Sequence, residues 1–203
     1  PSLDGKYVIY LISANGSEDA SLYVLNTETL MDIDRPISRV PFTAGICWFP
    51  DNQSFFYHRL QDLTEGMPAT EKYQNSQAYL HRLGTELEQD EVILKHNIAP
   101  LVGVPRTVWP QIPHISDSGY AIALFYHGTE RNIDLHISKL TALIQNTPEW
   151  IKLCDANDEI RHFVTHENDI YLLTSKNAPH FKIIKTSLAK PDLSTAKTVL
   201  AES

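Results

Sequence analysis

Cysteine is scarce in this sequence, which has only two, Cys47 and Cys154, among 203 residues. Two cysteines cannot build the disulfide framework that stabilises small secreted domains. Both lie in apolar segments with the composition of strands, so we expect buried thiols rather than the exposed thiolate that cysteine catalysis requires. Cysteine content leaves the cellular compartment open.

Long apolar runs and an excess of positive charge are also missing. No run approaches the ~18 residues of a membrane span, and residues 1–6 are not a basic segment followed by an apolar stretch. There are 17 lysines and arginines against 25 aspartates and glutamates, a formal net charge of −8. Because so acidic a chain repels phosphate groups, we expect neither nucleic acid nor membranes as partners.

Apolar residues are abundant, at 42% of the sequence against 21% charged residues, which is enough for a buried core. They fall in short runs separated by turn residues, and we expect fifteen strands with little room for helices. The expected strands are Tyr7–Ile12, Ser21–Asn26, Ile37–Val40, Gly45–Phe49, Ser54–Arg59, Gln77–Leu83, Glu91–His96, Gln111–Ile115, Tyr120–His127, Asp134–Leu140, Glu149–Cys154, His162–Thr165, Asp169–Ser175, Phe181–Ser187 and Thr198–Ala201.

The strands recur in groups. A turn with Asp4, Asp51, Asp117 or Asn168 precedes an apolar strand, and a second strand of alternating character follows each time. The spacing is about 50 residues, lengthened between Asp51 and Asp117 by insertions. Four strands per unit at this period are typical of the blades of a β-propeller.

We therefore expect an all-β fold, a partial β-propeller of about four blades, each a four-stranded antiparallel sheet. The blades are expected at about 1–40, which lacks its first strand, 41–97, 108–155 and 159–202, within one domain over residues 1–203. The apolar run Tyr120–Phe125 fits a blade covered on both faces and contradicts the strict alternation of a β-sandwich. Uncovered end blades would expose apolar faces, so self-association is expected.

Longer segments carry a family resemblance. Phe42–Arg59 (FTAGICWFPDNQSFFYHR), Tyr79–Thr85 (YLHRLGT), Trp150–Asp155 (WIKLCD) and Leu173–Ile184 (LTSKNAPHFKII) resemble, in order and spacing, the propeller of prolyl oligopeptidases. The resemblance covers nearly the whole chain. In that family a seven-bladed propeller caps an α/β-hydrolase domain, which cleaves short peptides, usually after proline, with a Ser-His-Asp triad.

The resemblance implies the non-catalytic part of a cytoplasmic or periplasmic serine peptidase. Its partners would be the protein's own α/β-hydrolase domain, absent from this chain, and short proline-containing peptides that the propeller admits while excluding large folded proteins. No cofactor is expected. None of the eight glycines forms the Gly-x-Ser-x-Gly turn of a hydrolase nucleophile, so the chain alone is expected to be inactive. The alternative is a stand-alone propeller that binds proteins or other ligands, and the flanking reading frame distinguishes the two.

Three substrate-binding residues are implied by the resemblance. Phe42 matches an aromatic residue that lines the pocket for residues upstream of the substrate proline. Thr129 and Pro110 fall where well-known members have cysteine and methionine, which would change the shape of that pocket. A structural role is the alternative for each, and for Phe42 it is that of a core or blade-junction aromatic. Five other aromatic residues are expected in the core between blades: Trp48, Phe55, Phe56, Trp109 and Tyr120.

Nine histidines raise the question of a metal site. His162 and His166 have the spacing that would aim both rings at one ion on a helix. On the expected strand they stand ~13 Å apart, too far to share an ion, so no metal site is expected. Asp32 and Asp34 could be an acidic pair, but we expect them to cap a turn.

Overall fold

The computed structural model describes residues 1–43, 45–145 and 147–202. Its strands are β1 (Tyr7–Ser13), β2 (Asp19–Asn26), β3 (Met31–Pro41), β4 (Cys47–Trp48), β5 (Ser54–Arg59), β6 (Gln77–Arg82), β7 (Glu91–Leu94), β8 (Trp109–Ile115), β9 (Tyr120–Tyr126), β10 (Asp134–Lys139), β11 (Ile151–Cys154), β12 (Ile160–His166), β13 (Asp169–Thr174), β14 (Lys182–Ser187) and β15 (Lys197–Leu200). Each of the fifteen expected segments overlaps one of these strands, which confirms the all-β prediction.

Helices are few and short in the described residues. The 3-10 segments are η1 (Ala14–Gly16), η2 (Ala69–Tyr73), η3 (Leu87–Gln89), η4 (Ala156–Asp158) and η5 (Leu193–Thr195), and the one α-helix there is α1 (Leu140–Ile144). None of these helices has the length and apolarity needed to cross a membrane.

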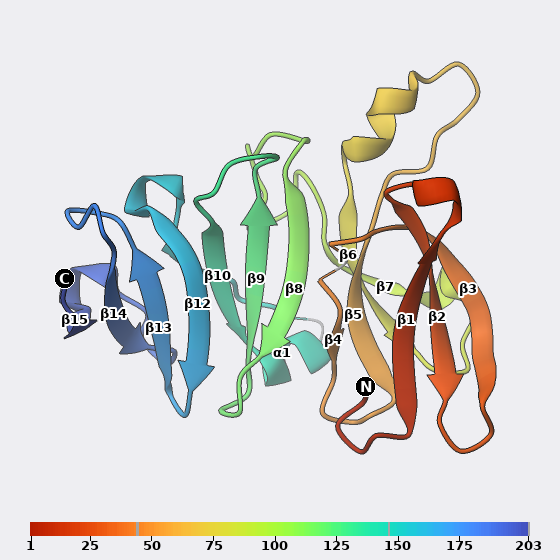
Figure 1. Cartoon of the computed structure of the whole chain (residues 1–203), viewed down its shortest axis with the longest axis horizontal. Helices are drawn as coiled ribbons and strands as arrows, with labels where there is room; N and C mark the ends of the chain where they lie inside the picture. Colours follow the sequence, from red (N-terminus) through yellow and green to blue (C-terminus); the bar gives the residue numbers. More distant parts are fainter. Residues whose placement is uncertain (44, 146, 203) are drawn as a thin grey trace. The chain divides into compact units, whose positions relative to one another are not determined.

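The strands form four sheets, each a meander in sequence order (Figure 1). The first sheet has the three strands β1-β2-β3, and the others have four each: β4 to β7, β8 to β11, and β12 to β15. The recorded strand pairs run antiparallel. This arrangement confirms the partial β-propeller, and its first sheet has three strands rather than four.

Contacts within the chain define two compact units, the N-terminal unit (Pro1–Pro113) and the C-terminal unit (His114–Ser203), divided inside β8. Each has its own apolar core. The N-terminal core contains Leu22, Val24, Ile37, Val40, Phe55 and Tyr57. The C-terminal core is built around Ile122, Leu135, Ile160, Ile170 and Leu172. The single domain over residues 1–203 stays a prediction.

The inner strands β5 and β9 are buried along almost their whole length, as expected for strands covered on both faces. Phe55 and Phe56 in β5 are fully buried. Three other aromatic residues expected in the core, Trp48, Trp109 and Tyr120, are only half-buried. Sequence composition thus predicted the inner strands correctly but overestimated the burial of three of the five aromatic side chains.

Two of the four repeated turns, those before β1 and β5, are fixed by the side chains of their aspartates. Before β5, Asp51 Oδ1 accepts the amide protons of Gln53 and Ser54 at 2.8 and 2.9 Å, and Oδ2 accepts the Ser54 hydroxyl at 2.9 Å. Before β1, Asp4 accepts the Ser2 hydroxyl at 2.7 Å and the Lys6 amide at 3.2 Å. These contacts satisfy backbone donors that no strand partner reaches.

The expectation of a turn at Asp32 and Asp34 is wrong, because β3 begins at Met31 rather than at Ile37. Asp32 accepts the phenol proton of Tyr10, with both carboxylate oxygens at 2.9 Å from the oxygen of Tyr10. Since β3 is an edge strand of its sheet, it tolerates Pro36 and charged residues that a central strand excludes.

The expectation that both thiols are buried is half wrong. Cys154 is buried, but Cys47 is half-exposed. Cys47 belongs to β4, a two-residue strand at the edge of its sheet, where burial on both sides is not available.

Candidate functional site

The structure places the three candidate substrate-binding residues in different surroundings. Phe42 follows β3 and is 63% exposed, so a role as a core aromatic is wrong. Pro110 is buried in β8, which agrees with its structural alternative. Thr129 is exposed in the turn between β9 and β10. Binding of substrate by any of the three stays a prediction.

The segments around Phe42 and Pro110 lie side by side in the N-terminal unit. The side-chain amide of Gln111 donates to the backbone carbonyl of Thr43, so the neighbours of the two candidates are hydrogen-bonded. Gly45 lies against the same glutamine: a Cβ at this glycine would stand 2.7 Å from Gln111 Cβ, and its φ is +57°. Only glycine fits here without displacement of Gln111.

Thr129 lies in the C-terminal unit, in a turn closed by two other side chains. His127 Nε2 lies 2.9 Å from Asp134 Oδ2, joining the end of β9 to the start of β10. The backbone amide of Glu130 donates to the carbonyl of His127 at 3.2 Å. The exposed threonine therefore sits in a turn restrained by these contacts.

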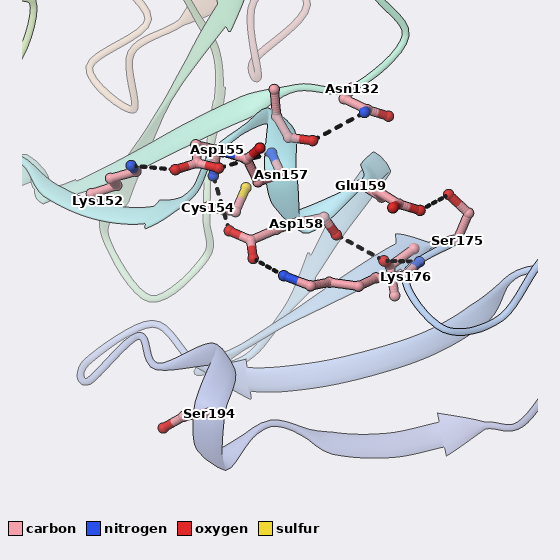
Figure 2. Close-up of polar contacts among 12 residues, drawn as sticks. Asn132, Lys152, Cys154, Asp155, Asn157, Asp158, Glu159, Ser175, Lys176 and Ser194 are labelled. Atoms are coloured by element: carbon pink, nitrogen blue, oxygen red, sulfur yellow. Dashed lines mark hydrogen bonds and ion pairs between the residues drawn. The ribbon is translucent and has the colours of Figure 1, made fainter.

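A polar network lies around η4 in the C-terminal unit (Figure 2). Asp155 and Asp158 form a capping box, in which Asp155 Oδ1 accepts the Asn157 amide at 2.8 Å and Asp158 Oδ2 accepts the Asp155 amide at 3.1 Å. Lys152 contacts Asp155 at 2.6 Å, and Lys176 contacts Asp158 at 2.9 Å. The hydrogen bond from Lys152, with that from Asn157, holds the pKa of Asp155 below its usual value.

A hollow of about 360 Å³ adjoins this network, lined by Asp158, Thr174, Lys176, Lys182 and Ser194 among others. The lysine and aspartate on its rim neutralise each other through their contact at 2.9 Å. The aspartates are occupied with capping the backbone of η4, so the network orders the connection between β11 and β12. This arrangement is structural.

The buried cysteine is unsuited to nucleophilic catalysis. Burial raises the pKa of Cys154 to about 12, and its Sγ lies 3.5 Å from the carbonyl oxygen of Ile133. A thiol with so high a pKa carries almost no thiolate at neutral pH. Nor do the described residues place three or more His, Cys, Asp or Glu side chains where they could hold a metal ion. His162 and His166 both lie on strand β12 and are exposed.

Sequence reasoning missed one cluster altogether. His81 of β6 lies between the carboxylates of Asp34 and Asp90, and Asp90 is also bonded to the phenol of Tyr57. The four residues are far apart in sequence and come from different strands and turns. The one signal in the sequence is a histidine, His81, within an otherwise largely apolar strand segment.

Meandering four-stranded sheets, aspartate-capped turns and strands apolar on both faces define the class of the chain as a β-propeller domain. The family model described as prolyl oligopeptidase, N-terminal beta-propeller domain, matches residues 1–203. The chain belongs to this family.

Known relatives agree with this membership. A prolyl endopeptidase of Elizabethkingia meningoseptica is 29% identical over 200 residues, which cover 98% of this chain and 26% of the relative. A solved prolyl endopeptidase structure has a TM-score of 0.80 at 20% identity. The matched region covers 100% of this chain and 28% of the solved chain. The propeller domain of the trilobed protease of Pyrococcus furiosus has a TM-score of 0.61 at 12% identity, with coverages of 98% and 55%. The chain thus spans about a quarter of the length of the curated relatives it matches.

Proposed function

We propose that this chain is the propeller part of a prolyl-oligopeptidase-like serine peptidase, where it admits short proline-containing peptides to an α/β-hydrolase domain outside the 203 residues. The observation that carries the proposal is the family match over residues 1–203. Relatives named prolyl endopeptidase are about four times as long as the stretch they share with this chain, which leaves room for a catalytic domain.

The chemistry of the chain supports a non-catalytic role. The sequence lacks the Gly-x-Ser-x-Gly motif, and the buried thiol of Cys154 is held protonated. A propeller of this kind contributes shape and steric exclusion, whereas bond cleavage needs a nucleophile, a base and oxyanion donors that come from elsewhere.

Assay of the purified 203-residue chain on a chromogenic peptide with proline before the scissile bond tests the first half of the proposal. We expect no cleavage above the buffer blank. Proline-specific cleavage that a serine-reactive inhibitor abolishes would show that the chain carries its own catalytic centre.

The gating role needs the longer protein that contains this chain. One proline-containing sequence is offered twice, as a free short peptide and as an exposed loop of a stable folded carrier. We expect cleavage of the free peptide only, because the carrier is too large to pass the propeller. Equal cleavage of both forms would rule out gating, while cleavage of neither would count against the peptidase itself.

Self-association of the isolated chain is a further part of the proposal. The last sheet presents an apolar hollow of about 310 Å³ lined by Val164, Tyr171, Leu173, Ile183 and Val199 among others. Val164 and Val199 are more than half exposed. We expect sedimentation at tens of micromolar to give species larger than a monomer, and a Val164→Lys variant to shift them toward the monomer. A clean monomer contradicts this expectation.

The compartment, cytoplasm or periplasm, also remains a proposal. Two thiols without a disulfide are compatible with either. Fractionation of cells that express the longer protein tests it, and recovery from the culture medium would contradict both assignments.

A further inference from the structure

His81 lies at the contact between the first two sheets of the N-terminal unit, with a carboxylate on each ring nitrogen. Its side chain is 1% exposed. Nδ1 lies 2.7 Å from Oδ1 of Asp90, which precedes β7 in the same sheet. Nε2 lies 3.5 Å from Oδ2 of Asp34, which belongs to β3 of the other sheet. The ring thus bridges the two sheets.

Both carboxylates are held in place by donors other than the histidine. The Tyr57 phenol donates to Asp90 Oδ2 at 2.6 Å. The Gly84 amide donates to both oxygens of Asp34, at 3.0 and 3.1 Å. The ring of Phe55 packs against His81 with centroids 5.2 Å apart. Each carboxylate therefore has one donor group besides the ring, and the ring is its second restraint.

The donor count of imidazole favours the protonated ring at this place. A neutral imidazole has one N–H and would turn a lone pair toward the second carboxylate, whereas imidazolium has an N–H for each. Burial alone would lower the pKa of His81, but the hydrogen bonds and negative charges of Asp90 and Asp34 outweigh burial and raise it. At 3.5 Å the Asp34 contact is an ion pair rather than a close hydrogen bond, so it depends on the charge of the ring.

Asp34 itself is held in an unfavourable conformation. Its φ is +62°, the left-handed region that residues with a side chain rarely adopt. Such a conformation persists where surrounding contacts hold it, here those of Gly84 and His81. Loss of the charge on His81 removes one of these two restraints.

We propose that His81 is a proton-operated clasp between the sheets β1-β2-β3 and β4 to β7, closed when the ring carries two protons. On deprotonation the contact between the ring and Asp34 is lost, and the link between β3 and the turn after β6 loosens. This is a regulatory device within the N-terminal unit, and it does not depend on the proposed peptidase function.

The other charged groups around the clasp do not replace it. From β3, Arg35 lies 3.6 Å from Glu86 of the segment after β6, and both side chains are largely exposed to screening solvent. From β5 the titratable neighbour is Tyr57, whose pKa is raised by burial and by the Asp90 hydrogen bond, so it stays a neutral donor. On β6 itself Arg82 is exposed. Only the His81 contacts in this set are both buried and titratable near neutral pH.

The first test is an NMR titration of the His81 ring in the 203-residue chain. We expect a midpoint above 6.5, the ordinary value for histidine, and a lower midpoint in Asp34→Asn. The matched control is Asp32→Asn on the same strand. The Asp32 carboxylate accepts the phenol proton of Tyr10 and does not contact His81, so this substitution should leave the His81 midpoint unchanged. A midpoint at or below 6.5, or one that Asp34→Asn does not move, overturns the proposal.

A second test uses the unaltered chain and so does not depend on the folding of the Asp34 variant. The Gly84 amide, which donates to Asp34, reports whether the clasp is closed. After correction for intrinsic exchange, we expect its hydrogen-exchange protection to fall about tenfold as pH rises through the His81 midpoint. In His81→Gln, which cannot titrate, protection should be low and independent of pH. Constant protection across the His81 titration in the unaltered chain contradicts the clasp.

Discussion

The two units of the molecule join their sheets in different ways. In the N-terminal unit, charged side chains cross between the first two sheets. Arg39 Nη1 donates to the Leu60 carbonyl, Arg59 Nε donates to the Ser38 carbonyl, both at 3.1 Å, and His81 faces Asp34. These contacts accompany an apolar core to which both sheets contribute.

In the C-terminal unit the sheets share a larger apolar core that runs from Ile122 of β9 to Leu188 after β14. Two polar links between these sheets are the Asn132 side chain donating to the Ala156 carbonyl at 3.0 Å, and His114 Nε2 lying 2.5 Å from Thr165 Oγ1. Apolar contacts do not titrate, whereas buried charged pairs do. The two junctions therefore differ in the protonation state they favour: the contacts of His81 raise its pKa and favour the protonated ring, whereas burial lowers the pKa of His114 and favours the neutral ring.

The largest expected effect comes from the apolar junction. Leu172→Ala removes a fully buried side chain from the C-terminal core and should lower the free energy of unfolding by about 3 kcal/mol. Hydrogen exchange of β13 amides localises the loss to that unit, and urea unfolding gives its size. A loss below about 1 kcal/mol would mean that the core is not what holds these sheets together.

The next largest effect is the loss of stability of the C-terminal unit at acid pH. Burial, with a smaller contribution from the charge of Lys152, lowers the pKa of His136 to about 4. The unfolded ring has a pKa near 6.5, so the stabilisation is present above that pH and is lost as pH falls toward 4. We expect the C-terminal unit to lose about 2 kcal/mol over this range, and His136→Gln to reduce the slope. The exposed His162→Gln serves as the control, and an equal slope in both variants contradicts the assignment.

The N-terminal unit responds in both directions. Burial lowers the pKa of His58 to about 3, so this residue also loses stabilisation as pH falls below 6.5. The raised pKa of His81 acts in the opposite sense, with stabilisation complete below 6.5 and lost as pH rises through the folded value. Above pH 6.5 we therefore expect the stability of the N-terminal unit to fall as His81, whose pKa is raised, loses its proton.

A smaller effect tests the polar junction itself. Tyr57→Phe keeps the ring that stacks on Tyr79, with centroids 5.4 Å apart, but removes the phenol that donates to Asp90. The buried carboxylate then lacks one donor, and we expect a loss of about 1.5 kcal/mol. Urea unfolding measures this loss. The matched control is Tyr10→Phe, which removes the phenol that donates to the exposed carboxylate of Asp32. Similar losses of unfolding free energy in both variants would show that the burial of Asp90 does not strengthen its hydrogen bond with Tyr57.

The same contrast explains what the sequence could and could not predict. Strands β5 and β9 were evident because continuous apolar runs of strand-forming residues have few other interpretations. The start of β3 was missed because aspartates and Pro36 suggest a turn, yet an edge strand accepts them. The contact of His81 with Asp34 joins residues of two different sheets, so it produces no periodic pattern in the sequence that could have predicted it. Phe42, Pro110 and Thr129 were accessible only through family resemblance.

The smallest expected effect on stability belongs to Phe42. Because its side chain is 63% exposed and outside the N-terminal core, Phe42→Ala should change the free energy of unfolding by less than about 0.5 kcal/mol. If the ring lines the substrate pocket of the longer protein, the same substitution should lower kcat/KM for a proline-containing peptide about tenfold, mainly through KM. Phe181→Ala, at a partly exposed aromatic of the C-terminal unit, is the matched control. Unchanged kcat/KM in Phe42→Ala would remove Phe42 from the pocket and leave its exposure without a functional reason.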